Sequence, residues 1–244
     1  MPKTPMYHDG MRRLQDERET RRLADRLEQV TVREAFTDDD RAFIERCAMF
    51  FVATADAEGR PECSYKGGLP GFVRVIDERT LAFPDYDGNG MYRSWGNVLV
   101  NPHVGLLFLD FEQPRRIRVN GTATIDTDDP LRAEFTGSVF VVRVVAERIF
   151  PNCPRYIHRM QLVEHSVYAP RPDTTPPVPA WKRYEAFRDA LRERDRGDDE
   201  SDGPGWWREL SLYSPTERGA HGRAAGAATA PNRAAAGGST VALP

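Results

Sequence analysis

Residues 103–125 read HVGLLFLDFEQPRRIRVNGTATI, and this stretch decides the fold. Its first part, 103–111, is an almost continuous apolar run, which is typical of a strand buried on both faces. After a short turn, residues 115–125 alternate between apolar and polar side chains, the pattern of a strand with one buried face. The chain is therefore rich in β-structure at its centre.

The same kinds of pattern recur on both sides of this stretch. AMFFVATA (48–55) also has the pattern of a strand buried on both faces. Further strands are predicted at 61–66, 72–76, 80–84 and 138–150. Six or seven strands joined mostly by tight turns, with few helices between them, predict a mainly β (α+β) fold built on an antiparallel barrel.

Helices are predicted around the barrel rather than within it. Residues 11–30 are expected to form one highly charged helix, whose thin apolar stripe would pack on the main body or on a partner subunit. A second helix is expected at 38–47, with Thr37 or Asp38 as its N-cap. A short helix is expected at 128–135, and a moderately amphipathic helix at 181–195.

These patterns divide the chain into four parts. Residues 1–36 hold the charged helix and its lead-in, and 37–168 form the barrel domain. Residues 169–195 combine a proline-rich linker with a C-terminal helix. Residues 196–244 are rich in Ala, Gly and acidic residues and are expected to be disordered, because they offer little apolar surface to bury.

Composition excludes several classes of function. The 244 residues carry 34 Lys and Arg against 37 Asp and Glu, so we expect neither a nucleic-acid partner nor a membrane surface. No apolar run reaches the roughly 18–20 residues that span a bilayer. Three widely spaced cysteines and five histidines give neither a disulfide framework nor a metal site. We expect a cytoplasmic protein without a bound metal, and no catalytic residue is predicted.

Residues 85–102, DYDGNGMYRSWGNVLVNP, offer a possible anion site. The Gly-Asn-Gly at 88–90 and the proline at 102 bracket a predicted helix that starts near Asn89 or Gly90. Arg93, Ser94 and Asn97 would share one face of it, the first two in the opening turn, where free backbone N–H groups attract anions. The alternative is an ordinary solvated helix face.

Two strands carry polar side chains that could complete such a site. Ser64 and Lys66 share a face of the 61–66 strand with Glu62. Arg116 and Arg118 share a face of the 115–125 strand. Alternatively, either face could be the solvent-exposed side of a sheet whose other side packs on the core.

The strings FFVATADAEGRPECSYKGGLPGFVRV (50–75), TLAFPDYDGNGMYRSWGNVLVNPHVGLLFLDF (80–111) and RIRVNGTATI (116–125) together resemble the pyridoxamine 5′-phosphate oxidase-related family. The resemblance covers about residues 40–165 and implies an FMN-binding split β-barrel of six or seven antiparallel strands with peripheral helices. It also implies a homodimer with two flavins at the subunit interface.

The resemblance assigns roles to particular residues. Lys66, Arg93 and Ser94 correspond to the family's phosphate-binding positions, with Asn97 one turn further on, and Ser64 and Asn89 lie beside them in the sequence. Pro84 and Asp85 would lie along the flavin ring. Arg116 and Arg118 would line the site, often from the partner subunit, where a cation stabilises the reduced flavin.

The family's activity implies an FMN-dependent oxidoreductase that acts on a small molecule, with NAD(P)H as a possible electron donor. Two departures argue against oxidation of pyridoxamine phosphate itself. Arg93-Ser94 stands where the oxidase has an Arg-Lys pair, and the oxidase's substrate-binding tail has no equivalent here. The alternative is a non-catalytic module that binds or carries flavin, F420 or haem, since this fold hosts all three.

Overall fold

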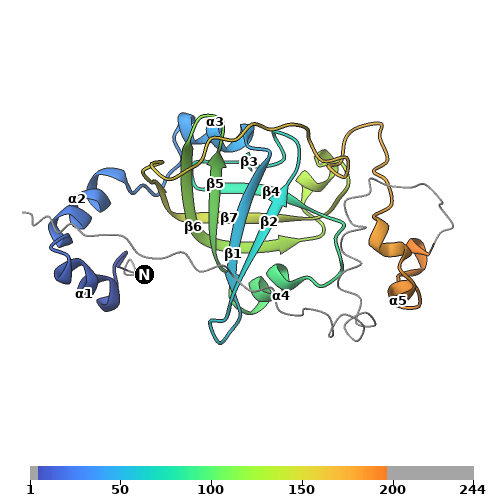
Figure 1. Ribbon diagram of the computed structural model, residues 1–244, viewed down its shortest axis with the longest axis horizontal. Coiled ribbons are helices and arrows are strands. Elements are labelled where there is room, and N and C mark those ends of the chain that lie inside the picture. The colour runs from blue at the N-terminus through green and yellow to red at the C-terminus, as the bar shows by residue number, and fades with distance from the viewer. Residues whose placement is uncertain (1–4, 197–244) are drawn as a thin grey trace, which may run out of the picture. The chain divides into compact units, whose positions relative to one another are not determined.

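The computed structural model describes residues 5–196, and its centre is one antiparallel sheet (Figure 1). The strand order is β2-β1-β5-β6-β7-β4-β3. The strands are β1 Met49–Ala55, β2 Pro61–Gly67, β3 Arg74–Val75, β4 Thr80–Tyr86, β5 His103–Asp110, β6 Arg115–Asp126 and β7 Ser138–Pro151. The sheet curls into a split barrel around an apolar core, which confirms the predicted fold class.

The β5–β6 hairpin forms the middle of the sheet, as residues 103–125 indicate. Phe108 lies opposite Ile117 and Leu106 opposite Val119, and all four side chains are buried. The alternation in β6 is thus confirmed, because its apolar positions all point into the barrel. Burial of four such side chains stabilises the hairpin by several kcal/mol, at about 1.5–3 kcal/mol each.

The prediction that β1 and β5 are buried on both faces is wrong for this chain. In β1, Phe50 and Val52 are buried, whereas Phe51 is half-buried and Ala53 is exposed. In β5, Leu107 is likewise only half-buried. The outer face of this part of the sheet also carries apolar side chains, although it is partly exposed to solvent. For this reason the sequence has continuous apolar runs that are typical of strands buried on both faces.

Four α-helices accompany the sheet in this part of the chain. They are α1 Asp9–Glu17, α2 Arg21–Thr31, α3 Asp38–Arg46 and α4 Arg93–Val100, and a 3-10 turn η1 covers Pro130–Glu134. The N-cap of α3 is confirmed, because Thr37 and Asp40 form a reciprocal capping box. Phe43 and Ile44 of α3 are fully buried in the core.

The single helix predicted for 11–30 is wrong, because the chain forms two helices there. Glu19 has a positive φ of 56°, which ends α1 and reverses the chain. An ion pair between Arg12 and Asp25 then joins α1 to α2. The apolar stripe faces solvent in the single chain, with Leu14 60% and Val30 71% exposed.

The chain divides into two units at Pro177 and Val178, and each is considered by itself. In the second unit, the predicted helix at 181–195 is wrong: the structure has three short turns, η2 Ala180–Arg183, α5 Glu185–Arg188 and η3 Glu193–Asp195. The expected disordered tail lies outside the described residues, except for Arg196. Among the helices of residues 5–196, none has both the length and the apolar character that a membrane span requires.

The hydrogen-bonded sheet does not close on itself. It ends at β2 on one side and at β3 on the other, and β3 pairs only with Leu81 and Ala82 of β4. The later residues of β4, Pro84 to Tyr86, therefore pair with β7 alone. This split between β2 and the end of β4 is where α4 lies, and it positions the candidate site.

Gly121 tests the packing of β6 on β7. A Cβ at this position would lie 2.1 Å from the Val145 carbonyl oxygen, at the β-bulge where the β6–β7 register shifts. We expect Gly121→Ala to lower the free energy of unfolding by about 2 kcal/mol or more, as overpacking against backbone does. Urea unfolding followed by circular dichroism measures this.

Gly96 in α4 is the matched control, since a Cβ there meets nothing within 4 Å. Gly96→Ala should leave stability unchanged or raise it by about 0.5–1 kcal/mol. Equal unfolding midpoints for the two variants would contradict the packing described here.

Candidate functional site

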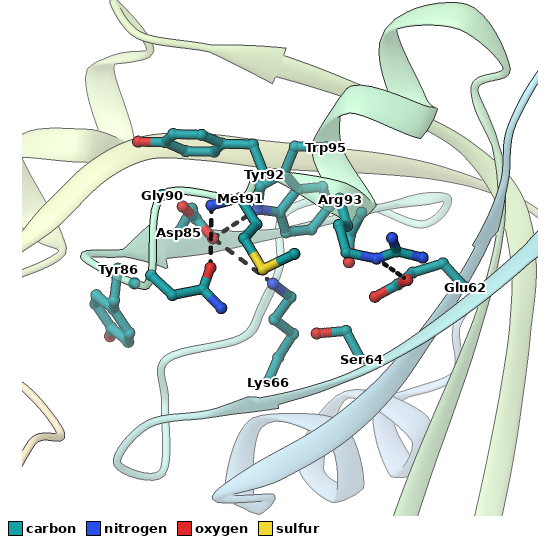
Figure 2. Close-up of a pocket in the computed structure, with 13 residues that line it drawn as sticks. Glu62, Ser64, Lys66, Asp85, Tyr86, Gly90, Met91, Tyr92, Arg93 and Trp95 are labelled. Atoms are coloured by element: carbon teal, nitrogen blue, oxygen red, sulfur yellow. Dashed lines mark hydrogen bonds and ion pairs between the residues drawn. The ribbon is translucent and has the colours of Figure 1, made fainter. Parts of the chain in front are cut away.

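A pocket of about 180 Å³ opens at the split in the sheet (Figure 2). Its walls come from β2, the end of β4, the loop 87–92 and the first turn of α4. β2 contributes Glu62, Ser64 and Lys66, three alternate residues that therefore point to the same side of the strand. Segments from opposite ends of the sheet thus meet around one cavity.

Lys66, Asp85 and Trp95 form a contact across the split. The Lys66 Nζ lies 3.8 Å from the Asp85 Oδ1, and the buried Trp95 indole donates a 2.6 Å hydrogen bond to that same oxygen. The Lys66 ammonium also lies 4.4 Å from the centre of the Trp95 ring, a cation–π contact. Figure 2 shows Lys66 reaching up from β2 toward Asp85.

Burial affects both charges of this contact. It raises the pKa of Asp85 above the usual value, although the Trp95 hydrogen bond and Lys66 partly oppose that rise. Burial likewise lowers the pKa of Lys66, and Asp85 partly restores it. Both shifts have the same cause, since a charged group is less stable away from water. Burial therefore disfavours the charged form of both partners of this ion pair.

Arg93 and Glu62 form a second ion pair at the mouth of the pocket. The Arg93 Nε lies 2.7 Å from the Glu62 Oε2. The Arg93 side chain is 61% exposed, so solvent screens this pair and it contributes little to stability. Such a cation can exchange one anionic partner for another at low cost.

The start of α4 faces the pocket. The helix begins at Arg93, later than the predicted start near Asn89 or Gly90, because Tyr92 adopts a left-handed φ of 48°. Asn89 instead caps the preceding turn, where its Oδ1 accepts from the Met91 N–H at 3.0 Å. Ser94 is buried in the first turn of α4 and lines the pocket. Backbone N–H groups in a first turn lack helical partners and favour an anion.

The structure brings together most of the residues that the sequence singles out. The predicted site residues that line this pocket are Ser64, Lys66, Asp85, Asn89, Arg93 and Ser94. Two others are close in sequence but lie elsewhere. Pro84 is buried within β4, and Asn97 donates a 3.0 Å hydrogen bond to the Thr54 hydroxyl of β1.

Arg116 and Arg118 lie on β6, outside this pocket. Arg116 donates to the Cys153 carbonyl at 2.8 Å, and Arg118 donates to the Asn152 side chain. Within residues 5–196 neither guanidinium pairs with a carboxylate. Burial, together with the like charge of Arg116, lowers the pKa of Arg118. Their predicted role beside a flavin remains a prediction.

Three features of the pocket were missed by the sequence interpretation. Glu62 was placed on the same face as Lys66, but its pairing with Arg93 was not predicted. The sequence patterns also do not predict a hydrogen-bonding role for Trp95, whose indole N–H donates to Asp85. A buried tryptophan needs an acceptor, and that requirement is a usable signal. Tyr86 also lines the pocket, and burial raises its pKa to about 12, which keeps its hydroxyl protonated.

The comparison with known families matches residues 36–163 to the pyridoxamine 5′-phosphate oxidase family. This chain belongs to that family. The match spans the whole sheet and every residue that lines the pocket, so the sheet is the split barrel of that family. No curated protein matches the chain.

Solved structures of similar fold come from several bacteria. HupZ of Group A Streptococcus is 25% identical, with 48% of this chain and 93% of HupZ covered and a TM-score of 0.39. A candidate pyridoxamine 5′-phosphate oxidase of Lactobacillus delbrueckii is 24% identical, with 48% and 95% covered and a TM-score of 0.40. HutZ of Vibrio cholerae, a haem storage protein, is 20% identical, with 46% and 91% covered and a TM-score of 0.36.

The raised pKa of Asp85 predicts how stability depends on pH. A carboxyl whose pKa is higher in the folded than in the unfolded chain stabilises the fold at low pH, and that stabilisation is lost as pH rises through the folded pKa. Asp85→Asn removes this titration and keeps an oxygen acceptor for Trp95. From about pH 4 upward, the wild type should lose stability relative to Asp85→Asn, until Asp85 is fully ionised.

Chemical unfolding at several pH values measures this difference. Asp128→Asn, a change at an exposed carboxylate that does not line the pocket, serves as the control and should follow the wild type. Parallel pH curves for the wild type and Asp85→Asn would show that Asp85 is not perturbed.

Proposed function

We propose that this chain is an FMN-dependent oxidoreductase that holds the flavin phosphate in the pocket at the split of the sheet. The observation that carries the proposal is the meeting of two cations, two hydroxyls and a helix start in one cavity of this family's fold. Lys66 and Arg93 supply the charge, Ser64 and Ser94 the hydroxyls, and the first turn of α4 the backbone N–H groups. This donor set fits a phosphate.

The size of the pocket supports a second subunit as part of the site. About 180 Å³ accommodates a phosphate group, whereas whole-ligand sites usually measure roughly 300–1,000 Å³. We therefore propose a homodimer in which the partner's surface completes the pocket. The partly open outer face of β1 and β5 and the exposed stripe of α1 and α2 supply apolar surface for such a contact.

In this proposal the chain's own residues bind the flavin and fix its position. Lys66 and Arg93 neutralise the phosphate, and Asp85, at the end of β4, lies where the rest of the ligand leaves the pocket. Arg116 and Arg118 of the partner subunit are the proposed cations beside the flavin ring, and their lack of carboxylate partners within residues 5–196 supports that role. A bound flavin supplies redox chemistry at its N5 atom, so no protein nucleophile is required.

The substrate is a small molecule whose identity the pocket does not define, and NAD(P)H is the proposed electron donor. The purified full-length protein tests this directly. Absorption near ~450 nm, alone or after addition of FMN, supports the proposal. Bleaching of that band by NAD(P)H distinguishes an enzyme from a carrier. A Soret band, selective uptake of F420, or a colourless protein that takes up no FMN would each contradict it.

Substitution of the cations tests the location of the phosphate. Lys66→Ala and Arg93→Ala each remove a charge-assisted hydrogen bond worth about 1.5–3 kcal/mol, so each should raise the Kd for FMN about ten- to a hundredfold. Titration of flavin fluorescence measures the Kd. Arg60→Ala, at the exposed tip of the β1–β2 hairpin, removes the same charge outside the pocket and should leave it unchanged. Equal affinities for all three variants would place the flavin elsewhere.

A further inference from the structure

The charges that line the pocket cancel before any ligand arrives. Lys66 and Arg93 are its two cations, and Asp85 and Glu62 are its two carboxylates. Each cation is already paired with one of these carboxylates. A phosphate that enters must therefore displace or neutralise a carboxylate to gain the full attraction of either cation.

The two ion pairs differ in how easily the carboxylate and its cation can separate. Glu62 pairs with Arg93 at the mouth of the pocket, and the Arg93 side chain is 61% exposed, so it can turn away from Glu62 into solvent. Asp85 is only 10% exposed in its side chain, and its Oδ1 accepts the buried Trp95 indole at 2.6 Å. If Asp85 swung away, that indole N–H would lose its acceptor inside the protein, which costs about 1–3 kcal/mol. Asp85 is thus fixed beside Lys66.

An ionised Asp85 and a phosphate on Lys66 would place like charges within a few ångströms in a partly desolvated site. Neighbouring anions of this kind do not both stay ionised, and one of them takes up a proton. We propose that Asp85 is a specificity-determining residue that takes up a proton when a phosphate group binds at Lys66. This inference rests on the proposed function, since it concerns the same pocket.

The surroundings of Asp85 support uptake of the proton at this carboxyl. From β2 it faces Lys66, with Glu62 beyond; from α4 it faces the Trp95 indole; and Asp87 of its own segment adds a like charge. The indole hydrogen bond and Lys66 favour the ionised form, whereas burial and Asp87 favour the protonated form. Burial has the largest effect and already raises the pKa of Asp85 in the free protein.

A protonated Asp85 keeps its place in the structure. One carboxyl oxygen still accepts from Trp95, and the Lys66 ammonium is released to the phosphate. The pocket then carries one net positive charge, from two cations against Glu62 alone. Above the pH at which Asp85 ionises, the pocket should discriminate against a doubly charged phosphate monoester.

The test measures the Kd of the full-length protein for FMN between pH 5.5 and 8.5, by flavin fluorescence. Over the pH range where Asp85 must take up a proton, wild-type affinity should fall by up to about tenfold per pH unit relative to Asp85→Asn. Asp85→Asn should bind FMN more tightly than the wild type at the upper end of the range. The phosphate's own ionisation near about pH 6 is common to both proteins and cancels in the comparison.

Two controls isolate the effect. Asp128→Asn, at an exposed carboxylate that does not line the pocket, removes the same charge elsewhere and should retain the wild-type pH dependence. Riboflavin, which lacks the phosphate, should show the same pH dependence with the wild type and with Asp85→Asn. Identical pH profiles for FMN with the wild type and Asp85→Asn would overturn the proposal.

A measurement without flavin separates this inference from the proposed function. The NMR signal of the Trp95 indole N–H reports the ionisation of Asp85, and saturating inorganic phosphate should raise the midpoint of its pH titration. If no FMN binds but phosphate raises the midpoint, the flavin proposal fails and the role of Asp85 stands. A midpoint that phosphate leaves unchanged overturns the role of Asp85.

Discussion

The contact of Lys66, Asp85 and Trp95 joins the two ends of a sheet that backbone hydrogen bonds leave open. β2 and the end of β4 have no ladder between them, and the Lys66–Asp85 pair spans that split while Trp95 anchors α4 beneath it. The pocket exists because the barrel is split there. The side chains that bridge the split are therefore the same ones that face a ligand, and stability and binding compete for their charges.

The parts of the fold that depend on local patterns could be predicted from the sequence. Alternation in 115–125 identifies β6, and the hydroxyl of Thr37 three residues before Asp40 identifies the start of α3. The break at Glu19 and the late start of α4 at Tyr92 could not, because both rest on positive φ values in residues other than glycine. Tertiary contacts, rather than local preference, stabilise such conformations.

The candidate site also has parts that the sequence predicts and parts that it does not. Alternation places Ser64 and Lys66 on one face, and family resemblance pairs that face with Arg93 and Ser94, which the pocket bears out as neighbours. Neither signal shows that the cations already form ion pairs with carboxylates, since Asp85 and Lys66 are 19 positions apart on strands that do not pair. A cluster of basic residues in a sequence indicates a place for an anion, but the anion already there is visible only in three dimensions.

The most direct test of this account is a crystal structure of the full-length protein grown with FMN. The account predicts phosphate density within hydrogen-bonding distance of the Lys66 Nζ, the Ser94 hydroxyl and the first backbone N–H groups of α4, with Arg93 turned from Glu62 to the phosphate. A flavin bound elsewhere, or a pocket in which both ion pairs persist and no phosphate lies between them, would contradict it.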